Sequence, residues 1–272
     1  MQSPTNDLTP TLQIVGLTKQ FGGLRAVSSF DLAVQQGELA GLIGPNGAGK
    51  TTVFNMITGL YVPTTGDILF NGENLVGLEP FEVTQQGISR TFQNIRLFPA
   101  LSVLDNVRIA YHIHAGYSLQ DGIFRTRHFA AKERELTERA VDLLSIFHLD
   151  RLQNETARNL PYGEQRRVEI ARALASNPKL LLLDEPAAGM NPGEIQTLME
   201  LIHFVRERFK LTVLLIEHQM RLVMGICERI TVMDFGEVIA RGDPAEIQSH
   251  PAVIEAYLGR GAAGRAAVKK VA

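Results

Sequence analysis

The chain has 272 residues with a formal net charge of -2, and 45% of its residues are hydrophobic. This is the composition of an ordinary globular protein, and the charge gives no general attraction to nucleic acid or anionic lipid. The single cysteine, Cys227, excludes an internal disulfide and a zinc site built on several thiolates. With its apolar neighbours, it is expected to be a small buried hydrophobic residue.

The N-terminal residues MQSPTNDLTPTLQ are polar and lack the basic and apolar regions of a secretory signal. No stretch approaches the roughly 18 consecutive apolar residues of a transmembrane helix. We therefore expect a cytoplasmic protein, held at a membrane only by another subunit if it acts there.

The first third of the chain predicts short strands joined by glycine-containing turns. Strands are expected at residues 12–15, 30–34, 39–43 and 67–70, and a helix at 51–60. From about residue 94 to 160 the pattern becomes helical.

Within this region, the apolar residues of 130–147 recur at three-and-four spacing, as on a helix face. The preceding residues 114–128 are mixed in character and are expected to form a loop or an exposed helix end.

Alternating helices and strands follow the helical region. They are expected as helices at 166–176, 192–209 and 219–227, and as strands at 179–183, 212–216, 229–233 and 238–241. The unbroken apolar runs within 180–183 and 213–216 are typical of parallel strands that are covered on both faces. The last residues, 259–272, have little to bury and are expected to be disordered.

A glycine-rich segment follows the strand at 39–43 and fits the pattern G-x-x-x-x-G-K-[ST] in full. Its glycines allow backbone N–H groups to surround phosphate, its lysine binds the β- and γ-phosphates, and its hydroxyl binds Mg²⁺. The alternative is a glycine-rich turn with a chance lysine, which the flanking strand and helix disfavour. The expected nucleotide-binding residues are Gly44, Pro45, Asn46, Gly47, Ala48, Gly49, Lys50, Thr51 and Thr52.

Two acids end the apolar strand in LLLLDEP. A buried Asp184 needs a partner, and Mg²⁺ beside Thr51 is one. Glu185 is placed to accept a proton from the water that attacks the γ-phosphate. The alternative is a pair of acids that caps a strand and meets a basic surface.

Two further polar residues lie where predicted elements end. The amide of Gln93 is suited to bind both Mg²⁺ and the attacking water, and His218 is suited to hydrogen-bond a γ-phosphate or position the water. Taken alone, His218 would be read as a structural histidine, but together with the other motifs it is expected to act at the γ-phosphate. The other histidines show no ligand spacing and are expected at the surface or in packing: His112, His114, His128, His148, His203 and His250.

The segment LPYGEQ, residues 160–165, predicts a turn centred on Gly163 that opens into a helix. Helix N-termini near a glycine bind anions, yet the nucleotide site is already complete without this one. Two copies facing head to tail would use it, with each ATP held between one chain's glycine loop and the other's Tyr162, Gly163 and Glu164.

In these motifs, in their order and spacing, the chain resembles the nucleotide-binding subunit of an ABC transporter. The resemblance implies an α/β fold: a P-loop NTPase (RecA-like) core with an antiparallel β subdomain and a helical insert that carries the signature motif, LPYGEQ. It implies one domain at 12–258, with a core at 12–93 and 177–240 and an insert at 94–176. ATP and Mg²⁺ are the implied cofactors, and Phe21 lies where the family stacks a tyrosine on adenine. The alternative for Phe21 is a core residue.

Two residues depart from the family pattern. The commoner signature is L-S-G-G-Q, and here Tyr162, with Pro161 before it, replaces the serine. The helix N-terminus remains for anion binding, but the serine contact is lost. Asn191 stands where an aspartate is usual, and its neutral amide keeps hydrogen bonds across the dimer but not the charge.

The segments LPYGEQRR, AAGMNP and FGGLRAV resemble the LivG-type ATPases of branched-chain amino acid importers. This implies a homodimer or a heterodimer with a related ATPase, beneath two membrane permeases, at the cytoplasmic face of the inner membrane. A substrate-binding protein is an indirect partner, and nucleic acid is not one. The groove beside Gln93 would receive a permease helix at Ile95, Leu97, Phe98 and Leu101.

Other functions remain open from the sequence. Similar subunits serve urea, amides or other amino acids, and a sister branch exports lipopolysaccharide. A soluble P-loop kinase would have an acceptor pocket and no use for LPYGEQ. A non-transport ABC protein that acts on DNA or ribosomes would have two nucleotide domains or a long coiled-coil insert.

Overall fold

The structure is a computed structural model, and it describes residues 10–258. The chain forms two compact units, which are described separately. The first contains residues up to Val83 together with those from Leu182 onward, and the second spans Thr84–Leu181. The tail at 259–272 lies outside the described residues.

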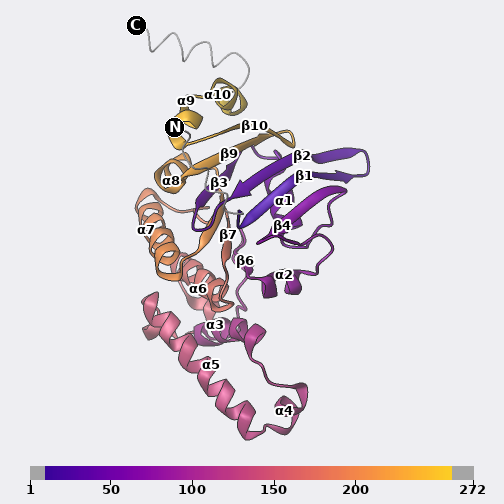
Figure 1. The fold of residues 1–272 in the computed structure, drawn as a ribbon. Coiled ribbons are helices and arrows are strands. Elements are labelled where there is room, and N and C mark those ends of the chain that lie inside the picture. The colour runs from indigo at the N-terminus through magenta and orange to yellow at the C-terminus, as the bar shows by residue number, and fades with distance from the viewer. Residues whose placement is uncertain (1–9, 259–272) are drawn as a thin grey trace, which may run out of the picture. The chain divides into compact units, whose positions relative to one another are not determined.

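An antiparallel sheet opens the first unit, with strand order β2-β1-β4-β5 (Figure 1). Its strands are β1 (Leu12–Phe21), β2 (Leu24–Val34), β4 (Thr65–Phe70) and β5 (Glu73–Asn74). The first two strands are longer than the apolar runs at 12–15 and 30–34 that predicted them. Pairing across the turn at Gly22-Gly23 extends both strands through polar residues, as far as Phe21 opposite Leu24.

A second sheet carries the apolar strands. Within the first unit its order is β10-β9-β3-β8-β7, with β3 parallel to both β8 and β9. The two runs expected to form covered strands, now β7 and β8, have side chains that are buried along their whole length, and β8 is parallel to β3. The strand bounds are Leu39–Ile43 for β3, Leu180–Asp184 for β7, Thr212–Ile216 for β8, Arg229–Asp234 for β9 and Glu237–Gly242 for β10.

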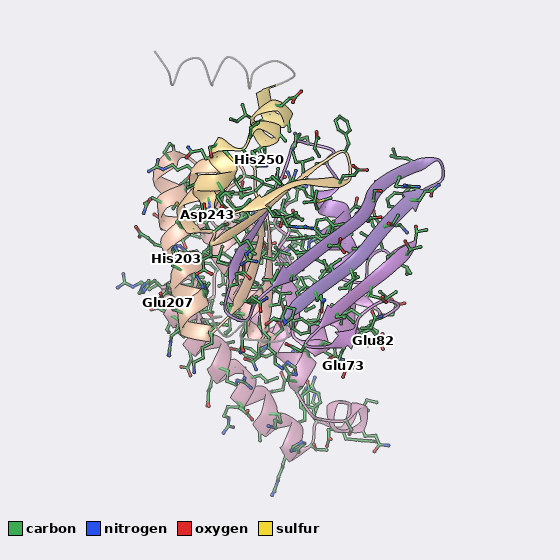
Figure 2. All side chains as sticks on the ribbon, turned by 45° about the horizontal axis from the view of Figure 1, so that its top comes forward. Glu73, Glu82, His203, Glu207, Asp243 and His250 are labelled. Atoms are coloured by element: carbon green, nitrogen blue, oxygen red, sulfur yellow. The ribbon has the colours of Figure 1, made fainter. Side chains whose placement is uncertain are left out.

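Helices of the first unit follow these strands along the chain. Their bounds are Lys50–Ile57 for α1, Pro192–Phe209 for α7, Met220–Ile226 for α8, Pro244–Ser249 for α9 and Pro251–Leu258 for α10. Asn191 and Asp243 begin α7 and α9, each with a reciprocal capping box. Figure 2 shows Asp243 and His250 at the two ends of α9, and His203 on α7.

The second unit is mostly helical. Its elements are β6 (Ile88–Arg90), α3 (Val103–Tyr111), α4 (Leu119–Phe124), α5 (Arg127–Ile146) and α6 (Tyr162–Ala175), with short 3₁₀ turns at His112–His114, Asp150–Leu152 and Ala157–Asn159. The helix α2 (Pro80–Gln86) begins in the first unit and ends in the second. On α5, Leu136, Ala140, Leu143 and Leu144 are buried, as their spacing predicted.

The segment at 114–128, expected to be a loop or an exposed helix end, contains a short helix of its own. This helix is α4, and its capping box is formed by Ser118 and Asp121. Cys227 is 5% exposed, as expected of a small buried hydrophobic residue. Burial raises the pKa of its thiol to about 12, and the charge of Glu228 adds to the shift.

Among the described residues, no helix has both the length and the apolarity needed to cross a membrane.

Candidate active site

The glycine loop joins the end of β3 to the start of α1, as predicted. Gly44 and Gly49 have positive φ values of 151° and 101°. A Cβ on Gly44 would lie 2.0 Å from the carbonyl oxygen of Met233, and one on Gly49 would lie 2.6 Å from that of Ala26. Beside Gly47 there is nothing within 4 Å of a built Cβ, so this side of the loop is open to a ligand. At Gly44 and Gly49 a side chain would clash with the backbone, whereas at Gly47 the absence of a side chain leaves space for a ligand.

Lys50 is the first residue of α1, and its side chain points into the loop that precedes it. Its Nζ donates hydrogen bonds to the carbonyl oxygens of Gly44, at 2.7 Å, and Pro45, at 2.9 Å. Burial lowers the pKa of Lys50, and the carboxylates of Glu185 and Asp184 oppose that shift. The two carbonyl oxygens satisfy hydrogen-bond donors but are neutral, so a phosphate in this loop would stabilise the buried ammonium.

The acid pair lies at the end of β7. Asp184 is the last residue of the strand and is 4% exposed, and Glu185 follows with a left-handed φ of 46°. Such a backbone is strained in a residue other than glycine and is held by its surroundings. Here the N–H of Glu185 donates to the carbonyl oxygen of Ile216, at the end of β8.

His218 lies beside Glu185, as the predicted roles require. The Nδ1 of His218 is 3.5 Å from an Oε of Glu185, and the imidazole is 45% exposed. The structure therefore brings Lys50, Asp184, Glu185 and His218 together within the first unit.

Glu217 was missed by the sequence reasoning. Its side chain is completely buried, and one oxygen accepts a hydrogen bond from the N–H of Ala187 at 2.8 Å. The other oxygen accepts from the N–H groups of His218 and Gln219, at 2.8 and 3.0 Å. Glu217 thereby ties the segment after Glu185 to the one that carries His218. The signal was available, since Glu217 follows an apolar strand just as Asp184 ends one.

Phe21 is half-exposed rather than a core residue. Its ring is 41% exposed and meets the ring of Tyr61 edge to face at 5.3 Å. The ammonium of Lys19 lies 5.0 Å from its centroid. Phe21 and Tyr61 therefore present an aromatic surface of the kind that a nucleobase stacks on.

The signature segment in the second unit differs from its prediction. The helix α6 already begins at Tyr162, so Gly163 lies in its first turn and is not the centre of a turn before it. Pro161, with its φ of -55°, occupies the N-cap position, and no side chain caps this helix end. The hydroxyl of Tyr162 accepts a hydrogen bond from Arg166 at 3.0 Å.

Arg166 and Glu169 hold the loop of Gln93 on α6, and both side chains are 1% exposed. Arg166 donates to the carbonyl oxygens of Phe92, at 2.8 Å, and Gln93, at 3.0 Å, and forms an ion pair with Glu169. Glu169 accepts from the N–H groups of Phe92 and Arg96. Gln93 itself is exposed, and its backbone position is fixed by the signature helix.

The apolar residues expected to receive a permease helix are Ile95, Leu97, Phe98 and Leu101. Phe98 is 48% exposed and the other three are half-buried. Asn191 uses its amide oxygen within its own chain, because the oxygen accepts from the N–H groups of Gly193 and Glu194. Its role across a dimer stays a prediction.

The residues fit a hydrated Mg²⁺ that arrives with a nucleotide. Thr51 offers an exposed hydroxyl, and Asp184 offers a buried carboxylate, which are the hard oxygen ligands that Mg²⁺ prefers. Within residues 10–258, no group of three or more His, Cys, Asp or Glu side chains could hold a metal alone. Mg²⁺ is usually bound through one or two carboxylates and the substrate's phosphates, so this donor set is sufficient.

Known proteins resemble this chain over most of its length. The chain is 46% identical over 250 residues to the high-affinity branched-chain amino acid transport ATP-binding proteins BraF of Pseudomonas aeruginosa and LivG of Escherichia coli, covering 92% of this chain and 98% of each relative. It is 37% identical to the lipopolysaccharide export system ATP-binding protein LptB of Escherichia coli, over 92% of this chain and 97% of that protein.

A solved structure and two family models agree with these relatives. The ADP conformation of MJ1267, an ATP-binding cassette of an ABC transporter, superposes with a TM-score of 0.80 at 32% identity, covering 92% of this chain and 99% of that one. A model described as ABC transporter matches residues 27–188, and one described as branched-chain amino acid ATP-binding cassette transporter matches residues 237–263. With its glycine loop and the acid pair at the end of β7, the chain belongs to the ABC transporter family as one of its ATP-binding cassettes.

Proposed function

We propose that this chain is the ATP-hydrolysing subunit of an importer for branched-chain amino acids. The observation that carries the proposal is the near full-length similarity to BraF and LivG, at 46% identity. The family model for this branch matches residues 237–263, where no predicted catalytic residue lies. The similarity to this branch is therefore separate from the ATPase chemistry that all cassettes share.

ATP binding is assigned to the glycine loop and Lys50. Backbone N–H groups of the glycine loop and of the first turn of α1, with the positive end of the α1 dipole, favour the phosphates. Lys50 exchanges its two carbonyl acceptors for phosphate oxygens. Phe21 stacks on adenine. Thr51, Asp184 and Gln93 would hold Mg²⁺, which, when bound, neutralises charge on the phosphates.

Hydrolysis is assigned to Glu185. Its carboxylate accepts the proton of the attacking water as the water oxygen bonds to the γ-phosphorus and the bond to the leaving oxygen breaks. His218, with its Nδ1 3.5 Å from Glu185, is placed to orient this water or a γ-phosphate oxygen. The buried Glu217 positions both residues by holding the backbone on either side.

The segment with Tyr162, Gly163 and Glu164 is assigned to a second cassette's ATP. The start of α6 has no side-chain cap, and its free N–H groups suit the γ-phosphate of a partner copy. The pair is a homodimer or a heterodimer with a related ATPase, bound to two permeases at the cytoplasmic face of the membrane. A substrate-binding protein completes the importer.

Purification from native membranes tests the proposal. The tagged chain is purified in mild detergent, its stoichiometric partners are identified, and uptake of radiolabelled leucine is measured in cells with the wild-type chain or Lys50→Ala. We expect two permeases, a second ATPase and leucine uptake that Lys50→Ala abolishes. Normal leucine uptake with loss of urea or amide uptake would assign another substrate. Copurification with lipopolysaccharide-export proteins, or recovery without membrane proteins, would contradict an importer.

A further inference from the structure

Two adjacent large apolar side chains are exposed at the end of α4. Ile123 is 70% exposed and Phe124 is 76% exposed. They are consecutive, and Figure 1 places α4 beside the first turns of α5. Because exposed apolar side chains of this size lose free energy in water, an adjacent pair on one short helix indicates a contact surface.

Basic residues follow this apolar pair immediately. Arg125, Arg127 and His128 are all exposed. Arg127 and His128 lie in the first turn of α5, where the helix dipole is positive, and that turn contains no acidic residue. Arg125 has a left-handed φ of 46°. The left-handed backbone of Arg125 and the positive charge at the start of α5 both lower local stability, which is typical of residues that have a function.

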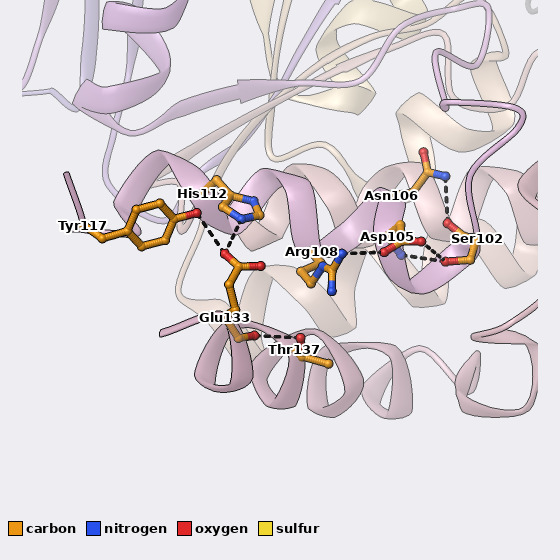
Figure 3. A network of polar contacts seen from close by, with 8 residues as sticks. All are labelled: Ser102, Asp105, Asn106, Arg108, His112, Tyr117, Glu133 and Thr137. Atoms are coloured by element: carbon orange, nitrogen blue, oxygen red, sulfur yellow. Dashed lines mark hydrogen bonds and ion pairs between the residues drawn. The ribbon is translucent and has the colours of Figure 1, made fainter. Parts of the chain in front are cut away.

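The two acidic side chains nearest in sequence are engaged within the unit. Asp121 accepts hydrogen bonds from the hydroxyls of Ser118 and Thr126, each at 2.8 Å. Glu133 accepts from the hydroxyl of Tyr117 at 2.8 Å and is paired with His112 at 2.8 Å (Figure 3). Asp121 also lies close enough to His128 for its pKa to be lowered by that imidazole. Among the described residues, Arg125 and Arg127 are in no ion pair, so these two cations are left to face an external anion.

The segment is held in place before any partner arrives. Thr126 caps α5 and bonds Asp121 of α4, which joins the two helices. The ring of Tyr117 packs edge to face against Phe129 of α5 at 5.0 Å. A surface that is ordered in advance loses little conformational entropy on binding.

We propose that residues 123–128, here called the α4–α5 tip, form an interfacial anchor that binds an anionic lipid surface. Ile123 and Phe124 enter the boundary between headgroups and acyl chains, while Arg125 and Arg127 pair with lipid phosphates. Two apolar side chains can bury far less than the roughly 800 Å² per partner that a stable protein interface buries. At a membrane, by contrast, apolar insertion and attraction between cations and anionic lipids both contribute to binding. That a bilayer lies nearby in the cell rests on the proposed function.

Vesicle flotation of the purified full-length chain tests this surface. We expect the chain to float with vesicles of equal parts phosphatidylcholine and phosphatidylglycerol, and to stay behind with phosphatidylcholine alone. The double variants Ile123→Ser/Phe124→Ser and Arg125→Gln/Arg127→Gln should each lower the partition coefficient about tenfold or more. All four side chains are exposed, so the fold should persist, and ATP affinity measured in parallel confirms it.

Matched controls come from elsewhere on the chain. Leu24→Ser removes an apolar side chain that is 69% exposed, and Arg151→Gln/Arg158→Gln removes two exposed positive charges from the second unit. Both should leave flotation unchanged. The proposal is overturned if the wild type ignores anionic vesicles, or if the controls lose as much binding as the tip variants. Loss of permease copurification by the tip variants, with no vesicle binding by the wild type, would instead make the tip a protein contact. Neither failure would affect ATP binding, so neither would contradict the proposed function.

Discussion

Replacing Glu169 with glutamine should destabilise the second unit far more than its conservative chemistry suggests. The carboxylate pairs with Arg166, and both side chains are 1% exposed. Removing one charge of such a pair leaves the other buried and uncompensated, which typically costs about 3–5 kcal/mol. An exposed surface pair is worth about 0–1 kcal/mol.

The expected loss converts into a measurable shift in thermal unfolding. For a chain of this size about 1 kcal/mol lowers the Tm by about 2–4 °C, so a loss of about 3 kcal/mol corresponds to about 6–12 °C. Arg167→Met is the matched control, because Arg167 is the next residue on α6 and its ion pair with Glu164, at 3.6 Å, is half-exposed. It should shift the Tm by less than about 4 °C.

A double-mutant cycle isolates the pair. Arg166→Met combined with Glu169→Gln should cost less than the sum of the two single changes, by about 1–3 kcal/mol, because the second change removes a charge that the first left unpaired. Unfolding of all four proteins by urea gives the coupling energy. Glu169→Gln within about 1 kcal/mol of wild type, or strictly additive changes, would refute the account of a buried pair that holds the Gln93 loop.

The remaining predictions concern the glycine loop, the signature helix and the cysteine. Gly44→Ala should abolish ATP binding and lower the Tm because of its backbone clash, whereas Gly47→Ala, with open space around it, should cost only the strain of its φ of 84°, about 1–2 kcal/mol by calorimetry. Tyr162→Phe removes the hydroxyl that accepts from Arg166, so we expect a loss of about 1 kcal/mol in urea unfolding with little change in ATPase rate; a large loss of rate would mean that the hydroxyl acts on phosphate. The thiol of Cys227 has a pKa near 9.0 in the unfolded chain and about 12 in the folded one, so the unfolded state binds fewer protons between these values. The free energy of unfolding should therefore fall as the pH rises from 9 to 12. A Cys227→Ala chain with an equally steep pH dependence would contradict this.

Local patterns predicted the parts of the fold that depend on neighbours in sequence. The apolar runs of β7 and β8 predicted strands covered on both faces, and all of their side chains are buried. The glycine pattern between β3 and α1 predicted the loop that the structure contains. The helix expected at 192–209 is α7, and the structure shows why it starts there: Asn191 caps its first turn, and proline occupies the first helical position.

Long-range contacts explain what the sequence did not reveal. Arg166 bonds Phe92 and Gln93, which are more than seventy residues away, so no local pattern indicates the contact. The start of α6 was placed too late because Gly163 was read as a turn, whereas Pro161 sets the backbone angle that lets helix begin at Tyr162. Glu217 had a readable signal, but its three backbone partners come from two separate segments.

The measurement that tests the central claim most directly is the ATPase rate of the purified transporter carrying Glu185→Gln. With Glu185 as the base, this variant should bind ATP with near wild-type affinity, hydrolyse it at least a hundredfold more slowly, given about 10²–10⁴-fold for general-base catalysis, and retain ATP in a stable cassette dimer. Turnover at the wild-type rate would contradict the assignment of Glu185, and failure of the wild type to bind ATP would contradict the function itself.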